Sequence, residues 1–359
     1  MRLPFYVRAS ILLIGIYILL EMLYIGQEII VPIIYSTLFA ILLSPIVGFF
    51  TKRKINRGLS IFITLVLAFS LVSALFIFLS SQGTRFSSAL PVLVDKFYSL
   101  INEEITGISS RFNISTESIN EYLSKTKAEV LSHLSQMIGD TLTTLGSTLV
   151  MMLLIPLYIF MVLLYRPLIL EFIYRVSGKE NNLKVNEMLT STKTLIQSYL
   201  AGLLIEAAIV AILYSSGLYI IGIEYAILLG IIGALLNVIP YLGGLIALAL
   251  YIIVAFTTKD SSTYIFGVII LFVAVHVIDN SYIIPKVVAS KVKINALVAI
   301  TAVLAGGAFW GVPGMFISIP LTGVIKLIFD RIEGLKPWGY LLGDAMPVRK
   351  SERKKNDKV

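Results

Sequence analysis

Residues 296–329 read ALVAITAVLAGGAFWGVPGMFISIPLTGVIKLIF, an apolar run interrupted near its middle by glycine and proline. A helix crosses the hydrocarbon layer of a membrane, about 30 Å thick, in about 20 residues. The run is too long for one ordinary span and too short for two. It predicts a re-entrant helical hairpin that returns to the membrane face it left. The alternative is a single tilted helix kinked at proline.

The apolar run at 225–258 has the same form, because NVIPYLGG interrupts it at 237–244. A predicted full span precedes each run, at 195–221 and at 263–285, and both spans carry a Tyr-x-x-Gly motif near the start. A span and a hairpin therefore occur twice in opposite orientation, which predicts an inverted repeat with tips at Pro240 and Pro313. In transporters built this way, the solute binds where the broken elements meet.

The composition extends this interpretation to the whole chain. Hydrophobic residues make up 57% of the sequence and charged residues only 14%, and the mean hydropathy is +0.92. These values are far from those of a soluble domain. We predict an all-α polytopic membrane protein with about six full spans and two re-entrant hairpins, or about eight membrane segments. The other spans are expected at 8–25, 29–50, 59–79 and 145–164.

Several function classes are excluded by what the sequence lacks. The basic residues that give the net charge of +8 stand at the ends of apolar blocks and form no face interleaved with aromatics, so we expect no nucleic-acid partner. With no cysteine and two histidines, we predict no metal site. We also expect no cofactor and no enzymatic activity, because P-loop, GxSxG, HExxH and dinucleotide-binding patterns are absent.

The basic residues also predict the topology. If the N-terminus is cytoplasmic and the spans alternate, all but six of the 29 Lys and Arg share the cytoplasmic side, as the positive-inside rule requires. The six on the other side are Arg85, Lys96, Arg111, Lys125, Lys127 and Lys259. We therefore predict a multi-pass protein of the cytoplasmic (inner) membrane with both termini in the cytoplasm.

A soluble pattern at 84–144 predicts a helical extracytoplasmic arm between the third and fourth spans. Its apolar stripes, such as Leu90, Val94, Phe97 and Ile101, need a partner. Either the two arm helices cover each other, or they contact another subunit in a homo-oligomer, which we favour. The resulting scheme has five parts: 1–83, the first three spans; 84–144, the arm; 145–194, the fourth span and a cytoplasmic surface helix at 168–193; 195–330, the transport core; and 331–359, a basic cytoplasmic tail.

Few polar residues lie inside the apolar blocks, where an ionisable group costs at least about 2.5 kcal/mol. For Asp279, beside Asn280 and Pro285, we favour a place on a solute or ion pathway over a cap or an ion pair with a nearby lysine. For Glu206 a pathway role and an uncharged buried carboxyl are equally weighted. Asn237 stands at the first hairpin tip. His276 is expected to be a packing residue.

The glycines at the tips are the remaining candidates. Glycine permits close approach and backbone angles that other residues avoid, which frees backbone groups to face a polar solute. Gly230 and Gly233 fit tight helix packing better. The predicted pathway residues at the two tips are Pro240, Gly243, Gly244, Gly306, Gly307, Gly311, Pro313 and Gly314.

Three motifs resemble a known family: NVIPYLGG at 237–244, DNSYIIPKVVASKV at 279–292 and GGAFWGVPGMFISIPLTGVIKLI at 306–328. They are similar to signature regions of the autoinducer-2 exporter family of bacterial permease-like proteins, and the resemblance covers nearly the whole chain. Asn295 departs from the family pattern, which commonly has proline there. The resemblance implies a multi-span transporter of autoinducer-2 or other solutes, or a Na⁺/H⁺ exchanger, and a homo-oligomer.

We therefore expect secondary transport, in the export direction, of a small polar solute such as an autoinducer-2-like signal molecule. In this hypothesis the two tips form the solute site near the middle of the membrane. The alternative within the same class is a cation/proton antiporter centred on Asp279 and Glu206, with H⁺ or Na⁺ as the ion. The alternative of another class is a scaffolding membrane protein whose arm recruits partners.

Overall fold

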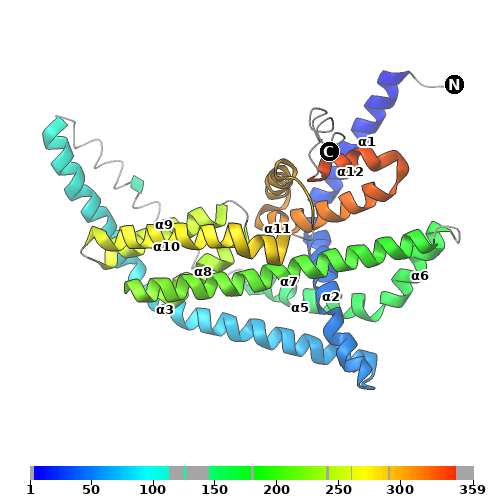
Figure 1. Cartoon of the computed structure of the whole chain (residues 1–359), viewed down its shortest axis with the longest axis horizontal. Coiled ribbons are helices and arrows are strands. Elements are labelled where there is room, and N and C mark those ends of the chain that lie inside the picture. The colour runs from blue at the N-terminus through cyan, green and yellow to red at the C-terminus, as the bar shows by residue number, and fades with distance from the viewer. Residues whose placement is uncertain are drawn as a thin grey trace, which may run out of the picture. The chain divides into compact units, whose positions relative to one another are not determined.

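The computed structural model describes residues 4–112, 125–126, 145–178, 182–239, 242–259, 261–289 and 292–344. This part of the chain is helical and contains no strand, only an isolated bridge between Ile294 and Gly343. Figure 1 labels the helices. Their bounds are α1 Phe5–Ile25, α2 Gln27–Lys52, α3 Arg57–Phe112, α5 Leu145–Leu164, α6 Arg166–Ser177, α7 Asn182–Ile221, α8 Ala226–Asn237, α9 Leu242–Thr258, α10 Ser262–Ile278, the π-helix η2 Asp279–Ala289, α11 Ala296–Arg331, the 3₁₀ turn η3 Glu333–Leu335 and α12 Lys336–Leu342.

Six helices in the described ranges are long and apolar enough to cross a membrane. They are Phe5–Ile25, Gln27–Lys52, Arg57–Thr84, Asn182–Ile221, Thr263–Val287 and Ala296–Arg331. A seventh candidate is Leu154–Leu164 together with Arg166–Ser177, a pair bent by 61°. The helix α1 buries none of its residues, as expected of a segment whose neighbours are lipid. The prediction of an all-α polytopic membrane protein is confirmed.

The chain divides into two units, which are described separately. One contains residues 1–42, 165–202 and 285–359, and the other contains residues 43–164 and 203–284. We call them the terminal unit and the central unit. Both units combine segments that are distant in sequence, whereas the five parts predicted from the sequence follow chain order and stay a prediction.

The third span does not end at 80–83, where the sequence becomes polar. Helix α3 continues to Phe112, because Ser81 and Thr84 donate their hydroxyls to the carbonyls of Phe78 and Ser81 within the helix. Phe97 of its arm portion packs edge-on against Phe256 of α9 at 5.8 Å between ring centroids. The arm therefore has a partner within its own chain at this point. The second predicted arm helix lies outside the described residues.

The stretch at 168–193, predicted as one surface helix, is divided in two. Helix α6 ends at Ser177 and is followed by Gly178, whose φ of +77° is unfavourable for other residues. Helix α7 then begins at Asn182 and runs without interruption through the predicted fifth span. The polar residues at 182–193 are thus the first turns of a long helix.

The first predicted hairpin is present as a chain reversal in the central unit. Helices α8 and α9 pack against each other and are joined by a short connection after Asn237. Glycine makes the packing close, because a Cβ at Gly233 would overlap the Tyr251 hydroxyl and a Cβ at Gly243 would overlap the Leu236 carbonyl. The packing role predicted for Gly233 is confirmed, as is that of Gly230, which lies against the Ser215 backbone.

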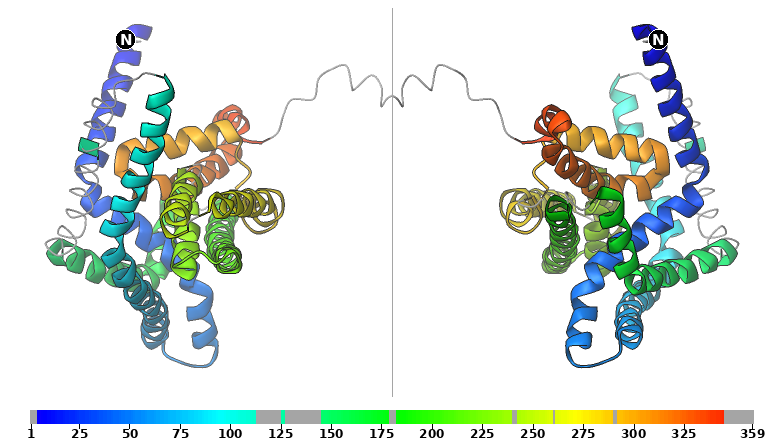
Figure 2. Two further views of the ribbon diagram at one scale, coloured as in Figure 1. Left: turned by 90° about the vertical axis from the view of Figure 1, so that its left-hand side faces the viewer. Right: turned by 90° about the vertical axis from the view of Figure 1, so that its right-hand side faces the viewer.

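The second hairpin is formed within α11, in the terminal unit. The backbone leaves helical geometry at Trp310 and Gly311, where Gly311 has a φ of +63°. The segments on either side then lie together (Figure 2), since a Cβ at Gly306 would stand 2.5 Å from the Gly314 carbonyl oxygen. In a straight helix these residues are about 12 Å apart. That the hairpins are re-entrant, and that they form an inverted repeat, stay predictions.

Candidate functional site

Three helices of the central unit bring together the polar residues of their apolar segments. Glu206 comes from α7, Asn237 is the last residue of α8, and Asp279 is the first residue of η2. The Asn237 amide donates to Asp279 Oδ2 at 3.0 Å and to Glu206 Oε1 at 3.4 Å. We call these three residues the carboxylate cluster.

Local structure explains how each side chain reaches the cluster. On α7, Glu206 lies in a buried stripe that continues at every fourth residue through Val210, Tyr214 and Leu218, which keeps the carboxyl on the packed face. Asn237 is placed by the end of α8. Asp279 lies where α10 passes into the π-helix η2, a form that often occurs at functional positions.

Both carboxyls are withdrawn from solvent. Glu206 is 6% exposed and Asp279 is 3% exposed. The Asp279 Oδ1 atom is buried and has no hydrogen-bond partner, although a buried carboxylate without full hydrogen bonding is costly. Asp279 Oδ2 accepts the Asn237 amide, while Lys291, one of the lysines considered as an ion-pair partner, lies outside the described residues, so the choice between a pathway role and an ion pair stays a prediction.

Aromatic side chains form the wall beside the cluster. Tyr214 lies 5.4 Å from Tyr251 and 6.3 Å from Phe272 between ring centroids. His276 stacks on Phe272 at 5.5 Å, in agreement with its predicted packing role. A Cβ at Gly244 would meet both Phe272 and the Asn237 side chain. The Tyr251 hydroxyl is buried without a partner, so a second polar atom in this region is unsatisfied.

Two other sequence candidates are near the cluster in sequence but do not join it. The Asn280 amide donates instead to the His276 carbonyl at 2.9 Å, and Asn280 and Pro285 are exposed. Pro240 lies outside the described residues. Gly243 contributes space for the hairpin rather than a polar backbone group.

The second tip has a different, steric character. Gly306 and Gly314 allow the two segments of α11 to approach, and a Cβ at Gly307 would lie 2.5 Å from Met315. The tip is tied to other helices of its unit. Tyr35 donates its hydroxyl to the Pro313 carbonyl at 2.9 Å, and Trp310 Nε1 donates to the Leu23 carbonyl at 3.3 Å. These contacts give the second tip glycines a packing role, and their place on a solute pathway stays a prediction.

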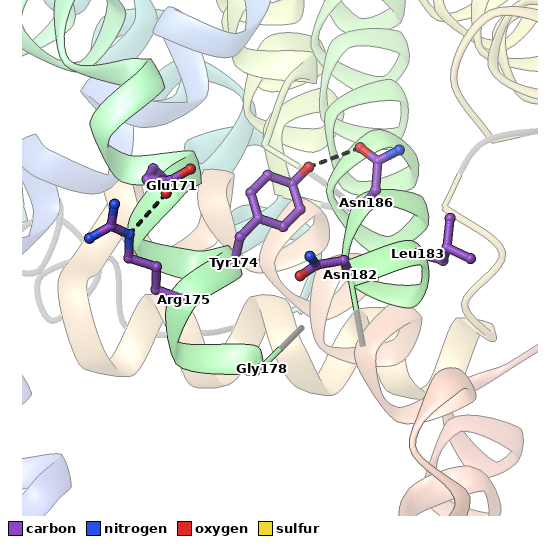
Figure 3. Close-up of a pocket in the computed structure, with 7 residues that line it drawn as sticks. All are labelled: Glu171, Tyr174, Arg175, Gly178, Asn182, Leu183 and Asn186. Carbon is purple, nitrogen blue, oxygen red and sulfur yellow. Dashed lines mark hydrogen bonds and ion pairs between the residues drawn. The ribbon is translucent and has the colours of Figure 1, made fainter. Parts of the chain in front are cut away.

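An open cavity of about 820 Å³ lies at the junction of α6 and α7 (Figure 3). Tyr174 donates its hydroxyl to Asn186 Oδ1 at 3.0 Å, and Arg175 pairs with Glu171 at 2.9 Å. This ion pair is largely exposed, so it contributes little to stability. None of the carboxylate cluster lines this cavity.

Sequence reasoning selected all three cluster residues but not their arrangement, and it overlooked Tyr214 and Tyr251. The four-residue spacing of Glu206, Val210, Tyr214 and Leu218 is the signal that indicates one shared helix face.

Comparison with known proteins identifies the family. The sequence model of one protein family, described as AI-2E family transporter, matches residues 10–334. The chain belongs to this family. A Haemophilus influenzae protein, named provisionally as a transport protein, is 27% identical over 346 residues, with 92% of this chain and 94% of the relative covered. The AI-2 transport protein TqsA of Escherichia coli K12 is 21% identical, with 89% and 90% covered. Family membership supports membrane transport as the general function.

Proposed function

We propose that the chain is a secondary transporter that exports a small polar solute across the cytoplasmic membrane and couples this movement to H⁺ or Na⁺ at the carboxylate cluster. The observation that carries the proposal is the Asn237 amide, which bridges two buried carboxyls from two other helices. In this arrangement the occupancy of one ion site affects three helices at once.

The chemistry of the cluster suits a monovalent cation. Two buried carboxylates held by one amide repel each other, and a single positive charge relieves that repulsion. The unpaired Asp279 Oδ1 is available to receive a proton or to coordinate Na⁺. The Asn237 amide can rotate to present its oxygen to a cation instead of its NH₂ group. Tyr214 and His276 interact electrostatically with Asp279.

A carrier must bind its coupling ion in one conformation and release it in another. The two carboxylates lie on the long helix α7 and at the α10–η2 junction, whereas Asn237 lies at the end of a short hairpin helix. Displacement of the hairpin would remove the only bridge between the carboxyls among the described contacts. We therefore assign the coupling to movement of the α8–α9 hairpin.

The second candidate function is cation/proton antiport, in which Na⁺ itself is the cargo. It is favoured by the same cluster, which offers hard oxygen ligands and needs no organic solute. The identity of the organic solute is proposed only by analogy. Since one relative is named as an AI-2 transport protein, an autoinducer-2-like metabolite is the first solute to test.

The test is flux into proteoliposomes under an imposed pH or Na⁺ gradient, with and without a panel of polar solutes. Solute movement that follows either gradient supports the proposal, and Asp279→Asn or Glu206→Gln should uncouple it. Asn280→Ala is the matched control, because Asn280 neighbours Asp279 but its amide donates to the His276 carbonyl and, among the described hydrogen bonds, to no residue of the cluster.

Proton movement driven by Na⁺ without any solute would favour the antiporter. Solute flux that ignores both gradients would overturn the coupling and favour facilitated diffusion. Protein that inserts and folds but moves neither ions nor solutes, while changes in the arm abolish its cellular function, would favour a scaffold.

A further inference from the structure

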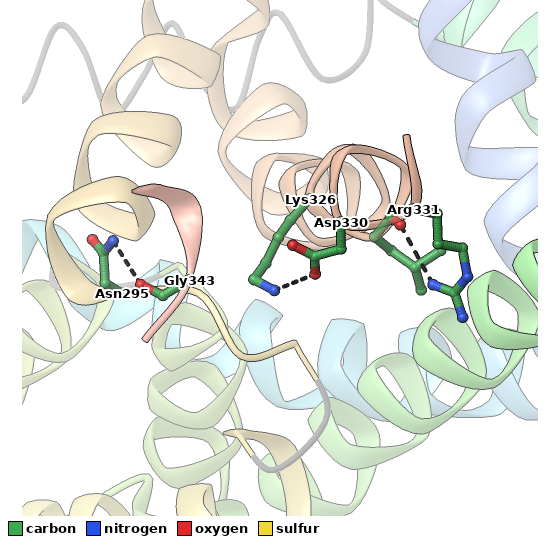
Figure 4. A network of polar contacts seen from close by, with 6 residues as sticks. Asn295, Lys326, Asp330, Arg331 and Gly343 are labelled. Carbon is green, nitrogen blue, oxygen red and sulfur yellow. Dashed lines mark hydrogen bonds and ion pairs between the residues drawn. The ribbon is translucent and has the colours of Figure 1, made fainter. Parts of the chain in front are cut away.

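The C-terminal end of the terminal unit forms a lysine-lined pocket that the transport proposal does not use. Figure 4 shows polar contacts of this region, among them Asn295 with Gly343 and Lys326 with Asp330. Helix α12 folds back on α11, and Gly339 packs directly against Asp330. Asn295 fixes the other end of α12, because its amide donates to the carbonyls of Leu341 at 2.8 Å and Gly343 at 3.0 Å. The same side chain caps α11 by accepting from the Val298 amide at 2.9 Å. Both sides of the pocket are therefore held in position.

The pocket has a volume of about 500 Å³ and is open to the outside. Its lining residues are Lys293, Lys326, Asp330, Lys336, Gly339, Tyr340, Gly343 and Asp344. Lys326 pairs with Asp330 at 2.6 Å. Lys293 and Lys336 are exposed, and the described residues offer neither of them an ion pair. Two ammonium groups unpaired among the described residues, those of Lys293 and Lys336, therefore face one further carboxylate, that of Asp344, and the pocket keeps a net positive charge.

Helix α12 adds an apolar surface beside these lysines. Trp338, Tyr340 and Leu341 are 59%, 55% and 61% exposed. Tryptophan and tyrosine concentrate at the headgroup level of membranes, where one part of the side chain is apolar and the other is hydrated. Lysine side chains extend to the same level, with the stem in apolar surroundings and the ammonium group among the headgroups.

We propose that this pocket binds the headgroup of an anionic phospholipid of the cytoplasmic leaflet. The lysines would contact the phosphate, and Trp338, Tyr340 and Leu341 would lie against the acyl chains. The charge distribution predicts that this end of the chain faces the cytoplasm, where the membrane surface is negative. The apolar surface favours a lipid over a soluble phosphate, because a soluble anion would leave these three side chains in water.

The chain offers a direct spectroscopic test, because Trp310 and Trp338 are its only tryptophans. In a Trp310→Phe protein, the fluorescence of Trp338 reports its neighbouring lipid alone. The full chain is placed in phosphatidylcholine nanodiscs that contain a small fraction of brominated phosphatidylglycerol or, in parallel, the same fraction of brominated phosphatidylcholine. We expect the anionic lipid to quench about threefold more strongly, a preference that decreases with salt.

The variants separate the pocket from general electrostatic attraction. Combined Lys293→Gln, Lys326→Gln and Lys336→Gln substitutions should make the two lipids quench equally. Lys52→Gln, Lys54→Gln and Lys184→Gln together change the net charge equally and should leave the preference intact. Equal quenching before any lysine is changed would overturn the proposal, as would a preference that survives the pocket substitutions. Loss of the preference in millimolar inorganic phosphate, with ionic strength matched by chloride, would show a soluble-phosphate site instead.

Discussion

Replacing Asn237 by alanine removes the bridge of the carboxylate cluster and leaves both carboxyls in place. The amide makes one hydrogen bond of 3.0 Å and one of 3.4 Å. A hydrogen bond to a charged group contributes about 1.5–3 kcal/mol net, and the longer bond lies near the geometric limit. We therefore assign about 2–4 kcal/mol to the bridge. Because these NH₂ donations stabilise the empty, charged carboxylates and must be given up when a cation binds, their loss strengthens binding of the coupling ion by about 30- to 700-fold.

The assay is ion-dependent flux in proteoliposomes as a function of Na⁺ or H⁺ concentration on the loading side. Asn237→Ala should lower the half-saturating ion concentration by at least about 30-fold, while size-exclusion elution in detergent stays unchanged. Asn280→Ala removes the same kind of side chain from an exposed position, where the amide donates to a backbone carbonyl. This variant should have little effect on the ion dependence. The reasoning is refuted if Asn237→Ala keeps the wild-type ion dependence, or if both alanine variants lose it equally.

Three further predictions concern stability and topology. Gly306→Ala should destabilise the detergent-solubilised protein by about 1–3 kcal/mol, because the added methyl group would overpack against Gly314. Gly15 has open space around it, so Gly15→Ala is the control and should be close to neutral in the same thermal unfolding measurement. Tyr251→Phe removes a buried hydroxyl that lacks a partner and should leave the melting temperature unchanged or raise it; a marked decrease would show that the hydroxyl is hydrogen-bonded. A single cysteine at Ser261 should react with an impermeant thiol reagent in intact cells and one at Ser351 only after permeabilisation, and the reverse result would invert the predicted topology.

The helical spans could be predicted from the sequence because each rests on one property, the length of an apolar block. Helix ends were harder to predict. The polar residues near Ser81 satisfy their hydroxyls within α3, so local polarity did not end the helix there. Gly178 did end a helix, since its backbone angle, rather than its polarity, decides the boundary. A pattern of polar and apolar residues therefore says little about whether a hydroxyl is satisfied within a helix or whether a glycine adopts a positive φ.

In the candidate site, too, the sequence predicts single residues better than it predicts contacts between distant helices. An ionisable or amide side chain in an apolar block is visible in the sequence, so Glu206, Asn237 and Asp279 could all be selected. Their contact depends on the packing of helices from separate parts of the chain, which no spacing within one segment encodes. The tip glycines were selected for their freedom of backbone angle. Only Gly311 has a positive φ among them, and at Gly243, Gly306 and Gly314 the need is for space.

The two hairpins therefore differ in what their tips do. The first ends at Asn237, whose side chain joins two carboxyls of neighbouring helices. The second is anchored through Trp310 and Pro313 to helices of its own unit, and no described carboxyl contacts it. A change in charge at the carboxylate cluster acts on the first tip directly, because the amide must reorient or withdraw when a cation arrives. We therefore expect ion-dependent changes in hydrogen exchange to concentrate at the end of α8 and the start of α9. Changes of equal size at 306–314 would show that the second tip also senses the ion.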